Sequence, residues 1–288
     1  MPQPPDPQDS RAILHPGVMA ERVRFERFAA PEEFAGILDW CWSVEWEMPP
    51  GESHAQETLS LPAVNISVGT TPPPGPHPPP RPYAVSPRVV GVATRRTTRV
   101  LSGSGWNVAA KASVGGFGAL YAGRVADLCD LEVPMRQVLA VDDERLGERM
   151  ASAPDSAERS ALLVAALEPV LAQADPERLR LAREVACIAE VAADQPEMVR
   201  VGDLAAYAGM SVRTLQRLFV EYAGVSPSWM LRRLRLIEAA ERVARGQDVR
   251  WADVAAELGY SDQAHLSRDF TAAVGQAPSA YAAAQRPT

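Results

Sequence analysis

The chain of 288 residues has little of several features that define other classes of protein. Its three cysteines, Cys41, Cys129 and Cys187, are far apart and form no Cys-x-x-Cys pair, so neither a disulfide framework nor a cysteine zinc site is expected. We interpret them as buried apolar thiols. No apolar run approaches the roughly 20 residues that a membrane-spanning helix needs. The N-terminus lacks the basic start and apolar core of a secretory signal. These absences predict a cytoplasmic protein with no membrane partner.

Histidine is also scarce, with four in the chain. His54 and Glu57 stand close together, slightly as in the first metal motif of a cupin barrel, but that motif needs further histidines nearby. The other three are His15, His77 and His265, and His77 falls in a proline-rich stretch. We therefore predict no metal and no cofactor. No cysteine has a neighbouring histidine to activate it, so an enzyme is not expected.

Lysine occurs once, at Lys111, and the other basic residues are arginines. The net charge of −7 argues against a protein that coats nucleic acid by charge alone. It leaves room for a specific DNA binder, because the placement of the basic groups decides that. A hydrophobic content of 47% with 23% charged residues is typical of a globular chain, and the length allows two domains.

The N-terminal half predicts β structure. From Arg22 to about Leu139, short apolar runs are broken by Pro and Gly, as in Thr98–Leu101, which favours short strands in an antiparallel sheet or small barrel. The proline-rich stretch Thr71–Pro82 predicts an extended surface loop. We expect residues 1–20 to be a disordered tail.

Three tryptophans, Trp40, Trp42 and Trp46, lie within seven residues. Alternation along a strand places all three on one face. One interpretation is that they pack in the core of the barrel or against the following helices. The other is that they line a ligand pocket, where aromatic side chains are common. The second interpretation makes a small-molecule effector a candidate partner.

After Ala140 the pattern becomes helical. Apolar residues recur at helical spacing in Asp142–Met150, Ala157–Gln173 and Pro176–Ala193. Asp175 reads as an N-cap, followed by a first-turn proline. These helices are expected to join two domains.

The stretch Val201–Tyr222 predicts a helix, a turn and a second helix. Leu204 faces inward on the first helix, Gly209 can adopt the left-handed conformation that ends it, and Ser211 is a good N-cap for the second. The outer face of the second helix carries Arg213, Gln216 and Arg217. This is the helix-turn-helix pattern of DNA-binding proteins.

The pattern recurs about 50 residues later, in Trp251–Val274. Gly259 makes the turn, and Ser261 or Asp262 caps the second helix. Trp251 is expected to pack in the core. The residues left to face outward are Gln263, His265, Ser267 and Arg268.

A continuous helical pattern, Pro227–Arg245, joins the two motifs. Some 18 residues at 1.5 Å rise span about 27 Å. Such a spacer can hold two recognition helices about one DNA turn apart, roughly 34 Å, so that both enter successive major grooves. Residues 213–245 contain seven arginines and three acids, a local balance of +4. We expect phosphates to lie there.

Residues 201–283 resemble the DNA-binding domain of the AraC/XylS family of bacterial transcription regulators. The segments that carry the resemblance are DLAAYAGMSVRTLQRLF, GVSPSWMLRRLRLIEA, WADVAAELGYSDQAHLSRDF and GQAPSAYA. The resemblance implies a seven-helix fold and sequence-specific binding near promoters. The family often has an arginine after the tyrosine, where this chain has Tyr281-Ala282-Ala283, so the phosphate contact of that arginine is not expected here. The N-terminal segment is more loosely similar to the small β-barrel domain that precedes this domain in one group of the family.

The resemblance implies that Arg213, Gln216, Arg217, Gln263, His265 and Arg268 read bases. Arginine and glutamine suit this role because they can pair bidentately with guanine and adenine in the major groove. Arg232, Arg233, Ser211 and Ser261 are the phosphate candidates. The arginines of the spacer cannot all face DNA, because neighbours on a helix point in different directions.

The sequence thus predicts an α+β chain: a tail (1–20), a β-rich effector or dimerisation domain (21–140), a helical linker (141–180) and a double helix-turn-helix domain (181–288). Its predicted function is a DNA-binding transcription regulator, commonly an activator in the family. Double-stranded promoter DNA is the expected partner, with RNA polymerase, a small-molecule effector and a homodimer as further candidates. The alternative is a DNA-binding domain fused to an enzymatic or covalent-sensor domain, which would need a recognisable nucleophile.

Overall fold

The computed structural model describes residues 22–58, 61–72, 75, 84–195, 198–244, 250–257 and 259–284. The predicted disordered tail and most of the predicted proline loop lie outside the described residues.

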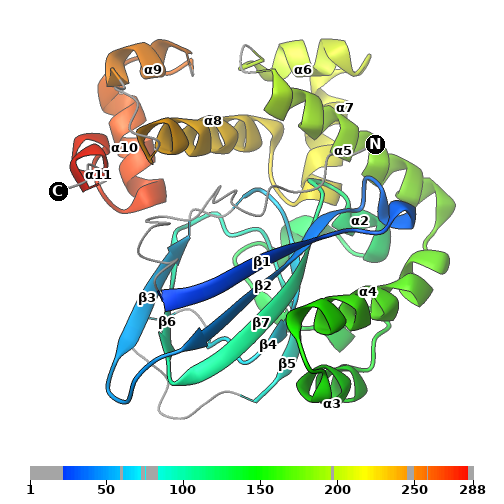
Figure 1. The fold of residues 1–288 in the computed structure, drawn as a ribbon. Helices are drawn as coiled ribbons and strands as arrows, with labels where there is room; N and C mark the ends of the chain where they lie inside the picture. The colour runs from blue at the N-terminus through cyan, green and yellow to red at the C-terminus, as the bar shows by residue number, and fades with distance from the viewer. Residues whose placement is uncertain are drawn as a thin grey trace.

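The N-terminal half is an antiparallel β structure, as predicted (Figure 1). A six-stranded sheet has the order β1-β2-β7-β4-β5-β8, and a separate two-stranded sheet pairs β3 with β6. The strands are β1 (Val23–Ala29), β2 (Leu38–Glu47), β3 (Ser53–Thr58), β4 (Asn65–Gly69), β5 (Ser86–Val90), β6 (Thr97–Ser102), β7 (Ser104–Ala112) and β8 (Glu132–Pro134). Short helical turns connect them: η1 (Glu32–Phe34), α2 (Phe117–Leu120), η2 (Val125–Leu128) and η3 (Met135–Gln137).

Three helices follow the sheet, close to the predicted ranges: α3 (Asp143–Ser152), α4 (Ser156–Ala172) and α5 (Pro176–Asp194). Each begins at an aspartate whose side chain accepts a hydrogen bond from a backbone N–H of the first turn: Asp142, Asp155 and the predicted cap Asp175. Such caps satisfy N–H groups that have no partner within the helix.

The C-terminal part is all-helical, as predicted. Its elements are α6 (Val201–Tyr207), α7 (Val212–Leu218), η4 (Phe219–Ala223), α8 (Pro227–Ala244), α9 (Trp251–Glu257), α10 (Gln263–Val274) and α11 (Pro278–Ala284). In Figure 1, α8 runs between the α6–α7 pair at one end and α9, α10 and α11 at the other.

The buried apolar side chains form two main clusters. The first core runs from Ile66 and Val108 in the sheet through Val185 of α5 to Leu215 and Phe219 of the first helix-turn-helix motif. The second core consists of the C-terminal half of α8 with α9, α10 and α11. The first motif is therefore packed into the same core as the sheet, whereas the second motif has a core of its own.

Close packing confirms that the first motif is joined to the sheet domain. A Cβ at Gly118 of α2 would come within 2.5 Å of the Tyr222 ring. Arg178 of α5 contacts both the segment around α2 and the first motif. Its guanidinium donates to the carbonyls of Gly118 and Gly123, 3.1 and 3.0 Å away, and lies 5.0 Å from the centre of the Tyr222 ring.

The cysteines differ in exposure. Cys41 is buried as expected, and Cys129 is half-buried with its thiol 3.0 Å from the carbonyl oxygen of Gly224. Cys187 is exposed, which corrects the expectation that all three are buried, because it lies on the outer face of α5. Among the described helices, none combines the length and apolar character that crossing a bilayer requires.

Candidate nucleic-acid interface and cavity

The first helix-turn-helix motif is built as its sequence pattern predicts. Gly209 has a φ of +64°, the left-handed conformation needed between α6 and α7. The Ser211 hydroxyl caps α7 by accepting a hydrogen bond from the Thr214 N–H at 3.1 Å. Leu215 and Leu218 are buried. The opposite face of α7 is exposed and presents Arg213, Gln216 and Arg217.

The second motif repeats this geometry. Gly259 has a φ of +71°. Asp262 caps α10 by accepting a hydrogen bond from the His265 N–H at 2.7 Å, which settles the choice between Ser261 and Asp262. That hydrogen bond also lowers the pKa of the Asp262 carboxyl. Ser261 is exposed beside it.

The outward face of α10 divides into exposed and packed residues. Gln263 and Arg268 are exposed. His265 is half-buried, with its ring edge-on to Tyr260 at 5.0 Å between centroids. Trp251 packs edge-on against Phe270 at 5.1 Å, in agreement with its predicted place in the core. The side chains best placed to enter a groove from α10 are therefore Gln263 and Arg268.

The three arginines at the start of the spacer helix α8 point in different directions, as expected. Arg232 is exposed. Arg235 is 3% exposed, and its guanidinium donates to the carbonyls of Ala192 and Gln195 at 2.8 and 2.7 Å. These carbonyls lie at the C-terminus of α5, where unpaired carbonyls and the helix dipole favour a cation. These hydrogen bonds of Arg235 therefore hold α8 against the C-terminus of α5.

Arg233 corrects the expectation of a phosphate contact. It is 4% exposed and donates to the carbonyl oxygen of Thr94 at 2.7 Å, with its guanidinium 4.7 Å from the centre of the Trp229 ring. Burial lowers the pKa of its guanidinium to about 10. In this arrangement the loop after β5 covers Arg233, so DNA cannot reach it.

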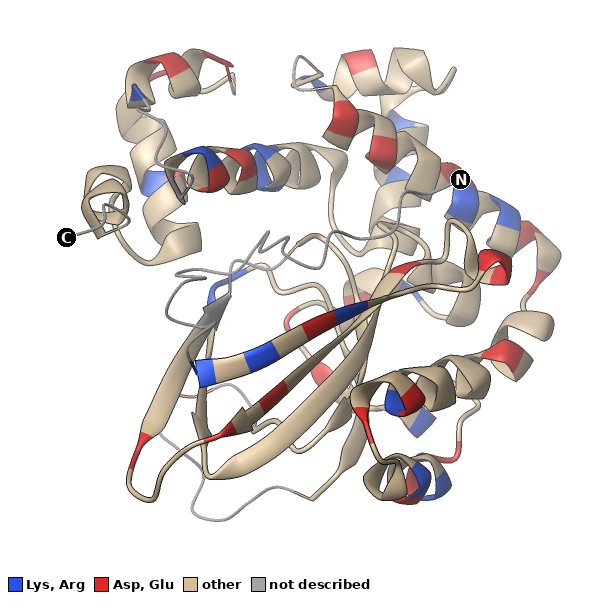
Figure 2. Cartoon of the chain, viewed as in Figure 1, with Lys and Arg blue, Asp and Glu red and all other residues tan. Residues whose placement is uncertain are grey.

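Much of the local positive charge is consequently inside the protein or paired. Arg242 forms ion pairs with Glu238 and Glu257 at 2.6 and 3.1 Å, and basic and acidic residues lie side by side on α8 in Figure 2. Arg245 lies outside the described residues. Among the described arginines of the two motifs and α8, the exposed ones are Arg213, Arg217, Arg232 and Arg268.

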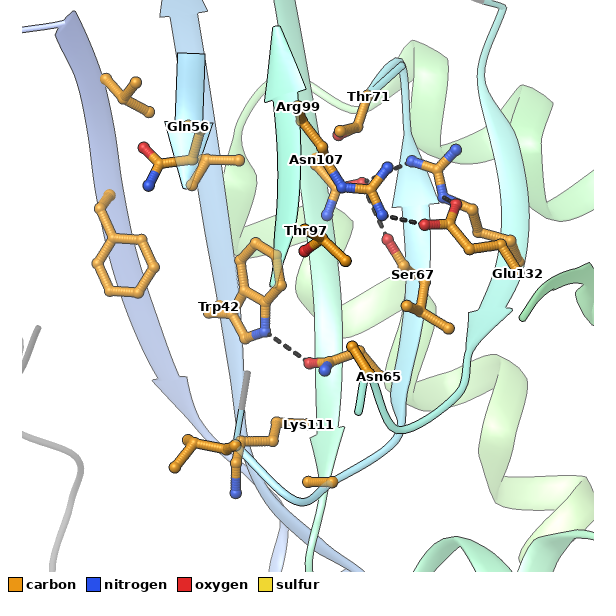
Figure 3. Close-up of a pocket in the computed structure, with 18 of the residues that line it drawn as sticks. Trp42, Gln56, Asn65, Ser67, Thr71, Thr97, Arg99, Asn107, Lys111 and Glu132 are labelled. Atoms are coloured by element: carbon orange, nitrogen blue, oxygen red, sulfur yellow. Dashed lines mark hydrogen bonds and ion pairs between the residues drawn. The ribbon is translucent and has the colours of Figure 1, made fainter. Parts of the chain in front are cut away.

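A cavity of about 240 Å³ lies between the two β-sheets. Trp40 and Trp42 line it, and the Trp42 indole N–H donates to the Asn65 side chain at 3.0 Å (Figure 3). Trp46 does not line the cavity. It is buried in a small cluster with Val23, Met48 and Leu101. Two of the three tryptophans thus line a cavity, and the third packs in a core.

The cavity also holds charged side chains that the sequence pattern did not reveal. Arg88 of β5 and Arg99 of β6 both pair with Glu132 of β8. Lys111 of β7 pairs with Asp39 and lies 4.4 Å from the centre of the Trp40 ring. Arg99 and Glu132 lie at the opposite end of the cavity from Lys111 in Figure 3. Alternation within β5 and β6 could have indicated that Arg88 and Arg99 point inward, but not that they meet.

Two exposed recognition faces at the ends of one spacer helix define the C-terminal part as a double helix-turn-helix domain. Residues 204–284 match the helix-turn-helix domain family. The predicted AraC/XylS resemblance is confirmed for this part of the chain, which is an AraC-type DNA-binding domain.

Two curated relatives are named as transcriptional activators. The transcriptional activator NphR of Rhodococcus sp. is 31% identical over 168 residues, which cover 58% of this chain and 46% of that protein. The activator RhaS of Pectobacterium carotovorum is 38% identical over 82 residues, 28% of this chain and 29% of that protein. The chain thus spans less than half the length of these relatives. Because 168 residues exceed the matched domain, the similarity to NphR extends beyond it.

Solved structures align with about a third of this chain or with most of it. The DNA-binding domain of AdpA in complex with a target DNA is 34% identical, with a TM-score of 0.30, over 37% of this chain and 92% of that one. ToxT from Vibrio cholerae is 10% identical, with a TM-score of 0.42, over 91% of this chain and 98% of that one.

Proposed function

We propose that this protein is a sequence-specific DNA-binding transcription regulator that inserts α7 and α10 into successive major grooves. The observation that carries the proposal is the pair of capped recognition helices, each with exposed Arg and Gln side chains, at the two ends of α8. The 18 residues of α8 span about 27 Å, close to the roughly 34 Å repeat of DNA.

Within this proposal, both recognition helices supply Arg and Gln side chains for base edges. Arg213, Gln216 and Arg217 do so from α7, and Gln263 and Arg268 from α10. His265 is a weaker candidate because its ring already packs on Tyr260. The phosphate candidates that remain accessible are Ser211, Arg232 and Ser261.

We further propose that residues 21–140 form an effector or dimerisation domain, 141–180 a linker and 181–288 the DNA-binding domain. The same proposal includes activation of transcription in the cytoplasm, contact with RNA polymerase and formation of a homodimer. It includes no enzymatic step. The names of the curated relatives support activation.

The part of the cavity wall formed by Leu61 and the loop after β5 also contacts α8 and the second motif, so a ligand in the cavity would be coupled to the second motif through this wall. Leu61 both lines the cavity and packs against the second core. Thr94, in the loop after β5, accepts the hydrogen bond from Arg233 of α8. Further along this loop, Arg96 lies against Gly275 at the end of α10, where an added Cβ would come within 2.5 Å of its guanidinium. We expect a ligand that moves this wall to change the affinity for DNA by about 5- to 150-fold.

A gel-shift titration of the full chain with the DNA upstream of its own gene tests the proposed function. The expected result is a specific complex at moderate salt that survives excess non-specific DNA, since specific sites bind about 10³-fold or more tightly. The absence of any complex with this DNA and with a pool of random sequences would contradict the proposal.

A further inference from the structure

The Arg88–Arg99 end of the cavity carries more positive charge than its protein partners neutralise. Glu132 is the carboxylate that both guanidiniums share, with the Arg88 Nε 3.8 Å from its nearer oxygen. The two arginine side chains are 12% and 19% exposed. Among the described residues, two buried cations against one carboxylate leave one positive charge at this end. Burial lowers the pKa of the Arg88 guanidinium to about 10, with the neighbouring Arg99 acting in the same direction.

Two hydrogen-bond donors at the same end, where Figure 3 shows Thr71 beside Arg99, have no acceptor among the described residues. The Arg88 Nε–H and the Thr71 hydroxyl are buried and have no hydrogen-bond partner in the part of the chain that the structure describes. Thr71 is 8% exposed, and both residues line the cavity. Buried donors without partners are uncommon because each costs free energy that a hydrogen bond would offset. Their presence beside an excess cation indicates a place for an anionic acceptor.

Apart from Arg27, Lys111 and several uncharged polar side chains, the rest of the cavity lining is apolar. Phe25 and Trp42 stack at 6.3 Å between ring centroids, and Val44, Val90 and Leu101 are among the other apolar lining residues. An engineered apolar cavity of about 150 Å³ holds one benzene molecule. The 240 Å³ available therefore accommodates a single ring, or a chain of similar size, together with a small polar group.

We propose that this cavity binds a small monocarboxylate with a compact apolar body. Its carboxylate accepts hydrogen bonds from Arg88 and Thr71 near Arg99, and its body packs on Phe25 and Trp42. One negative charge matches the one positive charge left at the Arg88–Arg99 end, whereas a phosphate dianion would leave an excess negative charge at this buried end. This inference rests on the proposed effector role of the cavity and adds the chemical class of the ligand.

Calorimetric titration of the full chain with benzoate, hexanoate, benzyl alcohol and inorganic phosphate tests this proposal. At least one of the two carboxylates is expected to bind saturably. A neutral compound of similar size is expected to bind about tenfold or more weakly than the carboxylate, because hydrogen bonds to charged groups are the stronger ones. Benzyl alcohol is the neutral compound for comparison with benzoate. Comparison of benzoate with hexanoate decides whether the body is a ring or a chain. Equal binding of benzoate and benzyl alcohol, tighter binding of phosphate, or no carboxylate binding would overturn the proposal.

Two variants test whether the carboxylate binds at the Arg88–Arg99 end of the cavity. Arg88→Gln is expected to weaken carboxylate binding about tenfold or more and to leave benzyl alcohol binding within about twofold of the wild type, since the apolar lining is unchanged. Thr71→Val keeps the side-chain shape and removes the hydroxyl, so it is also expected to weaken carboxylate binding. This variant provides the test if Arg88→Gln fails to fold. Arg149→Gln, an exposed residue of α3 outside the cavity lining, is the control for loss of one positive charge. Unchanged carboxylate binding in both cavity variants would overturn the assignment.

Binding and regulation are measured separately. If the carboxylate binds but the gel shift is the same with and without it, the ligand class holds and the coupling to DNA is wrong. If DNA binds normally and no carboxylate binds, the regulator proposal holds and the ligand class is wrong.

Discussion

Replacing Arg217 and Arg268 together by alanine is expected to lower the affinity of the full chain for its DNA site by between about 30-fold and 10⁴-fold. Each arginine is exposed on a recognition helix. A good bidentate contact to a base is worth about 1–3 kcal/mol, and contributions at well-separated positions add roughly. Each single variant is expected to give about half of this free-energy loss, and a gel-shift titration measures all three.

The matched control removes the same charge from another surface. Arg145 and Arg149 are exposed on α3, away from both motifs, and their replacement by alanine is expected to change the DNA affinity by less than about threefold, as for screened distant charges. If the Arg217 and Arg268 double variant binds as tightly as this control, the two helices do not read DNA.

Replacing Phe270 by alanine is expected to unfold the second motif while the rest of the molecule stays folded. Phe270 is fully buried in the second core, and its ring packs on Trp251 and Tyr281 at 5.1 and 5.7 Å. Truncation of a buried phenylalanine costs about 3–5 kcal/mol. Since the second core is separate from the first, hydrogen exchange is expected to speed up in α9–α11 and to remain slow in β7.

Phe219 provides the comparison, because it is equally buried but belongs to the first core. Phe219→Ala is expected to lower the free energy of unfolding by a similar amount and to speed up exchange in α7 and β7 together. If Phe270→Ala loosens β7 as much as α10, the two cores are one cooperative unit, and the expectation that the second motif unfolds separately is wrong.

The recognition helices could be predicted from the sequence because their signals are local. Gly209 and Gly259 mark the turns, and a cap stands two or three residues after each. Helical spacing then separates the buried Leu215 and Leu266 from the exposed Arg and Gln residues. Each of these features depends on neighbours within one or two turns, so the pattern alone fixes the face that is exposed.

The burial of Arg233 could not be predicted in this way. Helical spacing shows that it differs in direction from Arg232, but not which direction is covered. The cover is the loop at Thr94, 139 residues away in the chain. Only the tertiary arrangement of the sheet domain and α8 brings the two together.

The cavity was predicted in part. Alternation correctly places Trp40 and Trp42 on the strand face that lines the cavity. This face of β2 is longer than the cavity, and Trp46, further along the strand, packs in a neighbouring cluster. Arg88, Arg99 and Glu132 come from β5, β6 and β8, which belong to two different sheets. Their meeting depends on how the sheets face each other, for which the sequence spacing gives no signal.

A chemical footprint of the full chain on its DNA site tests the central claim most directly. Dimethyl sulfate protection reports on guanine edges in the major groove. The account predicts two protected segments on one face of the duplex, about 10–10.5 base pairs apart between centres. Arg217→Ala should remove protection from one segment and Arg268→Ala from the other. A single protected segment, unchanged in the Arg268→Ala variant, would contradict the claim that both motifs read DNA.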